Sequence, residues 1–439
     1  MKHADIIQTL DLEQKCALLS GGTVFDTRAL PGKGIPSITL SDGPNGVRKQ
    51  AGAADHLGLN PSVPATCFPT SATVANSWDP ALGEAVGEAM GEEAAAQEVS
   101  VLLGPGLNIK RSPLCGRNFE YFSEDPYLAG KMAAGYVRGI QKNGIAACPK
   151  HFAVNSQELR RMASDSIVDE RTLRELYLTG FEIVVKEAKP KTIMSSYNLV
   201  NGTYANENAH LLQDILRRDW GFDGAVVTDW GGSNDHALGV KNGSTLEMPF
   251  PGDDSVRELM KAVESGKISE HDVDARLDEL LELVLDTKAA VEKAPHTFDA
   301  AAHHALARRA AAQSIVLLRN EGALLPLKKG EKIAVLGDFA RTPRYQGAGS
   351  SAVNSIQVDS FLDCLTESGL TNVGYAQGFD RQGKADEDLK KEAVALAQNA
   401  NVVLLCMGLD EIKESEGLDR MDMKLAQNQL DLLAAVAAV

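Results

Sequence analysis

One short stretch, residues 222–232 with the sequence Phe-Asp-Gly-Ala-Val-Val-Thr-Asp-Trp-Gly-Gly, most constrains the fold of this chain. Gly224 supplies a turn, and the apolar run 225–227 is typical of a short strand buried on both faces of a parallel sheet. Asp229 stands where that strand should end. A carboxylate there is costly to bury for packing alone, and barrel enzymes place their chemistry at the carboxyl ends of strands. Taken alone, Asp229 could equally cap the next helix.

The same arrangement recurs along the first 290 residues. Short apolar runs near residues 35–40, 100–103, 145–148 and 192–194 alternate with helical patterns, and polar side chains follow the runs at Asp42, Lys150, His151 and Tyr197. A simple Asx turn is the alternative for Asp42. The alternation predicts a parallel α/β layer, of which a (β/α) barrel is the commonest closed form. The helices are expected at residues 4–19, 81–97, 128–142, 170–187, 209–220 and 256–290, and a fainter strand at 244–248.

A second α/β layer is predicted after a linker. The expected division is a barrel-like domain at residues 1–290, a linker at 291–305 and an α/β sandwich domain at 306–439. Its strands are expected at 315–318, 332–336, 372–376 and 401–407, and its helices at 304–313, 361–368, 384–398 and 424–438. The last helix stops at Val439 with no strand after it, so the sandwich is expected to be incomplete and the chain to be part of a longer protein.

Composition excludes several classes of function. The chain of 439 residues has 44 Lys and Arg against 60 Asp and Glu, a net charge of -16, which disfavours binding to nucleic acid or to anionic membranes. No apolar run suggests a signal peptide or a membrane span, so a cytoplasmic protein is predicted. Six widely spaced cysteines predict free thiols, and no ligand cluster implies a metal or an organic cofactor.

A second carboxylate is predicted from the acidic loop at residues 408–420, although a solvated loop is the commoner explanation of such a sequence. Two carboxylates from different segments can divide labour, one attacking and the other donating a proton. In retaining glycoside hydrolysis they lie about 5 Å apart. Donors to sugar hydroxyls, which would also keep Asp229 ionised, are available from Arg117, Lys150, His151 and Arg161, and Trp230 offers a flat face to a sugar ring.

The sequence resembles glycoside hydrolase family 3, and within it the bacterial β-glucosidase type. The matching stretches follow one another in order: 41–48 (Ser-Asp-Gly-Pro-Asn-Gly-Val-Arg), 111–126, 150–158 (Lys-His-Phe-Ala-Val-Asn-Ser-Gln-Glu), 194–198, 227–230 (Val-Thr-Asp-Trp), 246–249, 347–351 (Gly-Ala-Gly-Ser-Ser) and 415–420 (Ser-Glu-Gly-Leu-Asp-Arg). The resemblance implies a barrel-like first domain, an α/β sandwich second domain, and an exo-acting, retaining β-glucosidase that works through a covalent glycosyl-aspartate.

The resemblance also implies roles for single residues. Asp229 is expected to be the nucleophile and Glu416 the acid/base. The subsite for the non-reducing sugar is expected to contain Asp42, Arg117, Lys150, His151, Arg161, Tyr197, Trp230 and Ser350. The implied ligands are β-glucosides or short β-linked gluco-oligosaccharides, without a cofactor.

Several alternatives stay open at this point. A nucleotide-binding protein is one, from residues 333–338 and 347–351, but the glycines do not form a Gly-x-Gly-x-x-Gly turn between strand and helix. A sugar-binding protein without turnover is another. Glu414 competes with Glu416 for the acid/base role. Activity on β-xylosides or α-arabinosides and assembly into a homo-oligomer are undecided.

Overall fold

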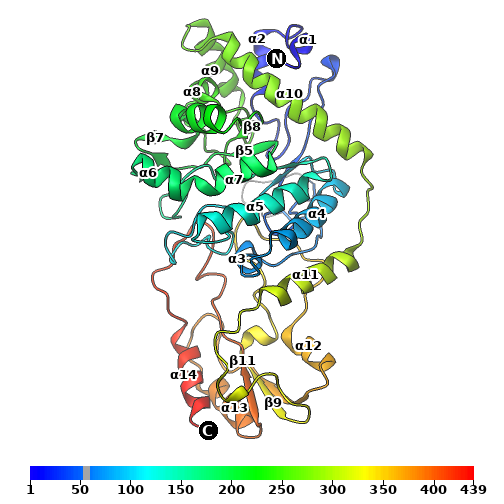
Figure 1. Cartoon of the computed structure of the whole chain (residues 1–439), viewed down its shortest axis with the longest axis vertical. Helices are drawn as coiled ribbons and strands as arrows, with labels where there is room; N and C mark the ends of the chain where they lie inside the picture. The colour runs from blue at the N-terminus through cyan, green and yellow to red at the C-terminus, as the bar shows by residue number, and fades with distance from the viewer. Residues whose placement is uncertain (53–59) are drawn as a thin grey trace.

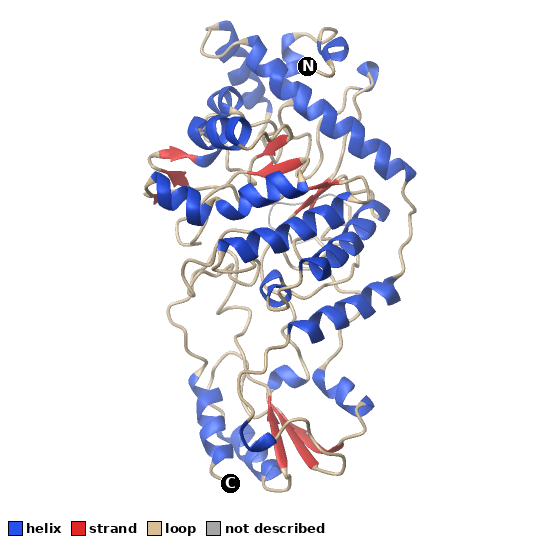
Figure 2. Ribbon diagram, in the orientation of Figure 1, coloured by secondary structure: helices blue, strands red, loops and turns tan. Residues whose placement is uncertain are grey.

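The computed structural model describes residues 1–52 and 60–439 and has a two-domain α/β architecture (Figure 1). The larger first domain surrounds short strands with helices, and the smaller second domain contains a separate sheet near the carboxyl terminus (Figure 2). Long loops of the second domain extend back to the first domain (Figure 2). The termini lie at opposite ends of the molecule.

The first domain is built on buried parallel strands at the predicted places. β1 (Leu40–Asp42), β2 (Val101–Leu103) and β3 (Ala146–Ala147) form one sheet in that order, and β5 (Thr192–Met194) pairs with β8 (Ala225–Val227). Single parallel bridges join Phe152 to Ser195, Val227 to Leu246 and Ser20 to Glu247. The predicted strand at 244–248 is therefore reduced to bridges. Backbone hydrogen bonds thus connect β1 stepwise to β8, then to residues 246–247 and on to Leu19 and Gly21.

The helices of the first domain pack around these strands. α4 (Pro80–Ala96), α5 (Pro126–Gln141) and α7 (Thr179–Ala188) form a contiguous layer, with Asp79 and Asp125 capping the first two. The predicted helix at 4–19 is instead two helices, α1 (Ala4–Ile7) and α2 (Leu12–Leu18), because Asp11 and Gln14 form a capping box that starts α2. The remaining helices up to residue 293 are α3 (Ser71–Ala75), α6 (Glu170–Thr172), α8 (His236–Asn242), α9 (Asp253–Glu264), α10 (Glu270–Lys293) and wide π-helical turns at Leu173–Tyr177 and His210–Asp219.

A small outer sheet and short 3-10 turns complete the first domain. The sheet has the order β4 (Asp165–Ser166), β6 (Leu199–Val200) and β7 (Thr203–Tyr204). The 3-10 turns are Pro31–Lys33 and Ala205–Glu207. None of the helices within residues 1–52 and 60–439 is long and apolar enough to cross a membrane. All six cysteines carry free thiols, as predicted.

The second domain has a three-stranded parallel sheet in the order β10 (Thr371–Ala376), β9 (Lys332–Leu336) and β11 (Val402–Leu405), confirming three of its four predicted strands. Successive residues of β9 point to opposite faces, so Val335 packs with Leu365 while Leu336 packs with Leu432. The helices are α12 (Phe361–Glu367), α13 (Glu387–Ala397) and α14 (Gln427–Ala437), with 3-10 turns at Glu321–Ala323 and Asp338–Ala340.

The predicted strand at 315–318 is wrong. Ile315 and Leu318 are 79% and 91% exposed, and no described segment forms a ladder with this stretch. An apolar run becomes a strand only where another strand takes up its backbone hydrogen bonds. The predicted linker at 291–305 is also mostly helical, because α10 reaches Lys293 and α11 (Ala300–Ser314) begins soon after. α11 packs on α3 and α4, so the predicted boundary at 306 falls inside a helix of the first domain.

Candidate active site

A cavity of about 690 Å³ is lined by residues that end or follow strands of the first domain and by residues on loops of the second domain. All ten residues predicted for the site line it: Asp42, Arg117, Lys150, His151, Arg161, Tyr197, Asp229, Trp230, Ser350 and Glu416. Phe25, Arg48, Gln50 and Met194 line it as well, although they were not predicted as site residues. Arg48 ends the 41–48 motif, so the sequence did contain a signal for it.

The first domain delivers its side chains from the carboxyl ends of strands, as the sequence predicts. Asp42 ends β1, Lys150 and His151 follow β3, and Asp229 follows β8. Tyr197 follows β5, and its hydroxyl donates to the carbonyl of Trp230 at 2.9 Å. The Trp230 indole is fixed by its Nε1–H, which donates to Val24 O at 2.8 Å, and by the Phe25 ring 5.2 Å away.

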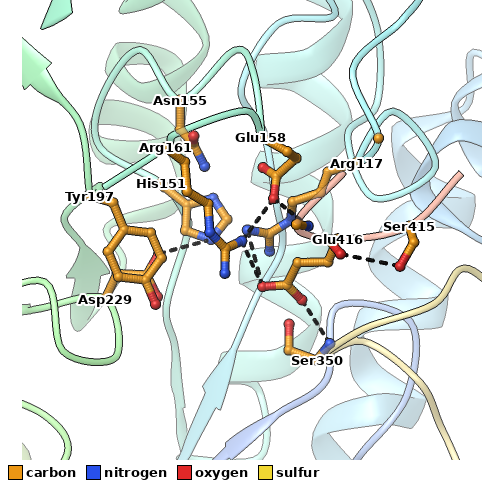
Figure 3. Close-up of polar contacts among 12 residues, drawn as sticks. Arg117, His151, Asn155, Glu158, Arg161, Tyr197, Asp229, Ser350, Ser415 and Glu416 are labelled. Atoms are coloured by element: carbon orange, nitrogen blue, oxygen red, sulfur yellow. Dashed lines mark hydrogen bonds and ion pairs between the residues drawn. The ribbon is translucent and has the colours of Figure 1, made fainter. Parts of the chain in front are cut away.

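The second domain delivers Glu416 and Ser350 on two adjacent loops (Figure 3). Glu416 N donates to Ala348 O at 3.0 Å, and Ser350 N donates to Glu416 Oε2 at 2.7 Å. Gly349 between them has φ +119°, and a β-carbon there would collide with Glu416. Only glycine permits both the backbone conformation and the close approach. Glu414 instead pairs with Arg344 at 3.1 Å and does not line the cavity.

A buried carboxylate that was not predicted, Glu120, organises two of the cations. Glu120 is fully buried; it accepts from Arg117 Nε at 2.7 Å and lies 3.1 Å from Lys150 Nζ. Burial by itself raises the pKa of Glu120, but the charges of Arg117 and Lys150 outweigh it and hold the pKa below its usual range. The only sequence signal for this pairing was that Glu120 follows Arg117 by three residues.

The electrostatics of Asp229 differ from the prediction. Asp229 Oδ1 accepts from Trp230 N at 2.8 Å, whereas Oδ2 has no hydrogen-bond partner among the described residues and lies 3.6 Å from His151 Nε2. Burial raises the pKa of Asp229 above its ordinary value, although Arg117, Lys150 and Arg161 act in the opposite direction. The cations thus limit the rise in the pKa without reversing it. Burial and the same three cations keep the pKa of His151 well below its usual value, so that its ring is neutral.

Glu416 is the carboxylate that the cations hold ionised. It lies 2.9 Å from Arg161 Nη1 and 3.7 Å from Arg117 Nη1. Burial alone would raise its pKa, but these charges and the hydrogen bonds from Ser350 hold it well below the usual range. With these contacts in place Glu416 is an anion, and weakening them would favour its protonation.

Asp42 is the third carboxylate of the cavity. Burial raises its pKa to about 6, with partial compensation from Lys150 and from Arg48. Arg48 lies 4.0 Å from Asp42 and donates to Ser350 O at 3.1 Å, so it connects the first domain to the Ser350 loop. Three carboxylates, four cations and the aromatic face of Trp230 around one cavity suit a ligand with many hydroxyl groups. No group of side chains that could hold a metal ion is present in residues 1–52 and 60–439.

The fold and the cavity define a two-domain α/β protein with a polar, charged cavity lined by residues of both domains, and comparison with known proteins gives its family. Residues 53–283 match the glycosyl hydrolase family 3 N terminal domain, and residues 315–439 match the C-terminal domain of that family. The chain belongs to glycosyl hydrolase family 3.

Curated relatives and solved structures agree with this assignment. The chain is 47% identical to thermostable beta-glucosidase B of Acetivibrio thermocellus, over 99% of this chain and 58% of that protein. It is 46% identical to exo-alpha-(1->6)-L-arabinopyranosidase of Bifidobacterium longum, over 98% of this chain and 58% of that protein. A GH3 beta-glucosidase of Bifidobacterium adolescentis superposes with a TM-score of 0.92 at 44% identity, covering 98% of this chain and 62% of that one. The chain thus spans less than two thirds of the length of these relatives.

Proposed function

We propose that this chain carries the active site of a retaining, exo-acting β-glucosidase that removes terminal β-D-glucosyl residues. The observation that carries the proposal is the placement of Asp229 and Glu416 in one cavity, one from each domain, among buried cations. Both domains are needed for such a site. The similarity to beta-glucosidases of Acetivibrio thermocellus and Bifidobacterium adolescentis supports the substrate class.

Asp229 is the nucleophile in the proposed mechanism. Its Oδ2, which has no hydrogen-bond partner among the described residues, attacks the anomeric carbon and forms a glycosyl ester while the bond to the leaving oxygen breaks. Glu416 gives its proton to that oxygen. In the second step Glu416 takes a proton from water, the water oxygen attacks the anomeric carbon, and Asp229 leaves as a carboxylate.

Substrate binding has to change the protonation state of Glu416. Glu416 has to gain a proton before it can donate one. In the proposed mechanism a sugar hydroxyl binds Arg161 and weakens its 2.9 Å contact with Glu416, which raises the pKa of Glu416 and favours its protonation. The remaining subsite residues bind the terminal ring: Asp42 accepts from hydroxyls, Lys150 and His151 contact them, and Trp230 covers one face of the ring.

The first domain is proposed to be an irregular (β/α) barrel, and the second an α/β sandwich of which this chain contains a part. The run of backbone hydrogen bonds from β1 through β8 to Leu19 and Gly21 supports the barrel. The length of the relatives supports the incomplete sandwich.

The test is release of nitrophenol from nitrophenyl β-glucoside, β-xyloside, β-galactoside and α-L-arabinopyranoside by this chain and by a chain extended to the length of its relatives. Hydrolysis led by the glucoside and abolished in Asp229→Asn is expected. A lead by the arabinopyranoside would instead favour the specificity named for the Bifidobacterium longum relative. Unchanged turnover in Asp229→Asn would exclude Asp229 as the nucleophile.

The acid/base assignment has its own test and a matched control. Glu416→Ala should lose most activity on substrates with poor leaving groups, by about 10²–10⁴-fold. Azide should restore its turnover of activated aryl glucosides. Glu414→Ala is the control from the same loop, and this behaviour in Glu414→Ala rather than Glu416→Ala would transfer the role to Glu414.

A further inference from the structure

We propose that Asp419 is a positioning residue that fastens the Glu416 loop, residues 415–420, to the first domain and so places the Glu416 carboxylate. The proposal rests on the proposed role of Glu416 as acid/base. Asp419 itself does not line the catalytic cavity. It would therefore act on the reaction only through Glu416.

The Asp419 carboxylate gathers backbone N–H groups from two separate segments of the first domain. Its Oδ1 accepts from Gly116 N at 3.1 Å and from Glu158 N at 3.0 Å. Its Oδ2 accepts from Leu159 N at 2.9 Å and is 3.1 Å from Glu158 N. Hydrogen bonds from N–H groups to a carboxylate are stronger than those to a neutral acceptor, so this contact is well suited to hold two domains together.

The first domain also contributes a carboxylate, that of Glu158, which accepts a hydrogen bond from the Glu416 loop. Glu158, which is 2% exposed, accepts from Gly417 N at 2.8 Å through Oε2. The same oxygen accepts from Arg161 Nη1 at 2.8 Å, and that nitrogen also donates to Glu416 Oε1 at 2.9 Å (Figure 3). Asp419 and Glu158 thus form a reciprocal clasp, and Arg161 connects the clasp to the carboxylate of Glu416.

The fit of the loop against the first domain leaves little room. A β-carbon at Gly116 would collide with Leu418 O and with Ser415 O, on both sides of Glu416 in sequence. Arg420 N donates to Leu114 O at 2.7 Å just beyond the clasp. The loop is therefore held on its own side by Ser350 and on the opposite side by the clasp.

An amide cannot replace the Asp419 carboxylate in this geometry. The N–H groups reach both of its oxygens, so one of them would face the NH₂ group of an asparagine, donor against donor. Asp419→Asn preserves size and removes one acceptor and the charge. Asp422→Asn is the matched control, because Asp422 is exposed a few residues further along the chain and accepts a hydrogen bond from the nearby Lys424 N.

The experiment compares kcat/KM on aryl glucosides with poor and with activated leaving groups. It uses whichever of the two chain lengths tested above hydrolyses the glucoside. Asp419→Asn should lose about 100-fold on the poor leaving group and much less on the activated one, since misplacing a proton donor by about 1 Å has this effect. The double variant Glu416→Ala/Asp419→Asn should be no slower than Glu416→Ala alone, and Asp422→Asn should match the wild type. An equal loss on both substrates, or a loss additive with Glu416→Ala, would overturn the proposal.

Hydrogen exchange gives a readout that does not need turnover and so separates this proposal from the proposed function. Asp419→Asn should speed amide exchange in residues 115–117, 157–159 and 415–420, while Asp422→Asn should not. Glu158→Gln, which alters the other half of the clasp, should loosen residues 415–420 as well and covers the case in which Asp419→Asn does not fold. Unchanged exchange in a folded Asp419→Asn protein would refute the clasp even if Glu416 is the acid/base.

Discussion

Gly116→Ala should separate the position of the Glu416 loop from its chemistry, because it adds one carbon atom at the place where the loop touches the first domain. That carbon would overlap Leu418 O and Ser415 O, both backbone atoms that cannot rotate away. Relief of the overlap requires the loop to move by more than about 1 Å, since the added carbon would lie 1.7 Å from Leu418 O and carbon and oxygen atoms are repelled well inside a separation of about 3.5 Å. Glu416, between these two residues in sequence, moves with them.

The expected magnitude follows from that displacement. A misplacement of about 1 Å costs about 10²-fold in rate, equivalent to about 2.7 kcal/mol in the barrier. Extra volume at a packed contact costs about 1–3 kcal/mol of folding free energy. The loss in kcat should be largest for β-glucosides with poor leaving groups, because these depend on the proton from Glu416.

The assay is kcat for aryl glucosides of graded leaving-group ability, with urea unfolding measured in parallel. Gly32→Ala is the control, because Gly32 is exposed and a β-carbon there meets nothing within 4 Å. Wild-type turnover and wild-type dependence on the leaving group in Gly116→Ala would refute the argument that this contact sets the position of Glu416.

Three further predictions concern charge. Arg161→Gln removes a guanidinium 2.9 Å from Glu416, so the pKa of Glu416 should rise. In the pH profile of kcat/KM, the limb on which Glu416 loses its proton should then move to higher pH. A limb that stays in place would belong to another group. Glu120→Gln removes the buried carboxylate that pairs with both Arg117 and Lys150 and should reduce the free energy of unfolding by about 3–5 kcal/mol, measured with urea; a loss within about 0.5 kcal/mol, as expected for a surface change, would contradict it. Burial lowers the pKa of His303, but Glu93 and Glu92 outweigh it and raise the pKa above the unfolded value, so this contribution to stability is complete below about pH 6.5 and is lost as the pH rises through the folded pKa. The unfolding free energies of wild type and His303→Gln should therefore converge with rising pH, and a constant difference would show that the charge of His303 is not the cause.

The sequence predicted most of the candidate site because its residues stand at positions that a local pattern marks. Each of Asp42, Lys150 and Asp229 ends or follows a short buried run, and such runs become parallel strands whose carboxyl ends converge. Glu416 was likewise predicted from a short contiguous motif, residues 415–420. The apolar pattern at 315–318 was not enough to predict a strand correctly, because a strand also needs a neighbouring strand for its backbone hydrogen bonds, and the run itself does not specify one.

The sequence by itself determined most of the helices and strands and which polar residues follow the strands, since both depend largely on neighbours in the chain. Only the tertiary structure decided the charge states and the close contacts. Arg161 and Glu416 are 255 residues apart in the chain, yet their 2.9 Å contact helps to hold the pKa of Glu416 below its usual range, whereas burial raises the pKa of Asp229. Coulomb energies and desolvation depend on distance and burial, which are properties of the folded molecule rather than of any local stretch of sequence.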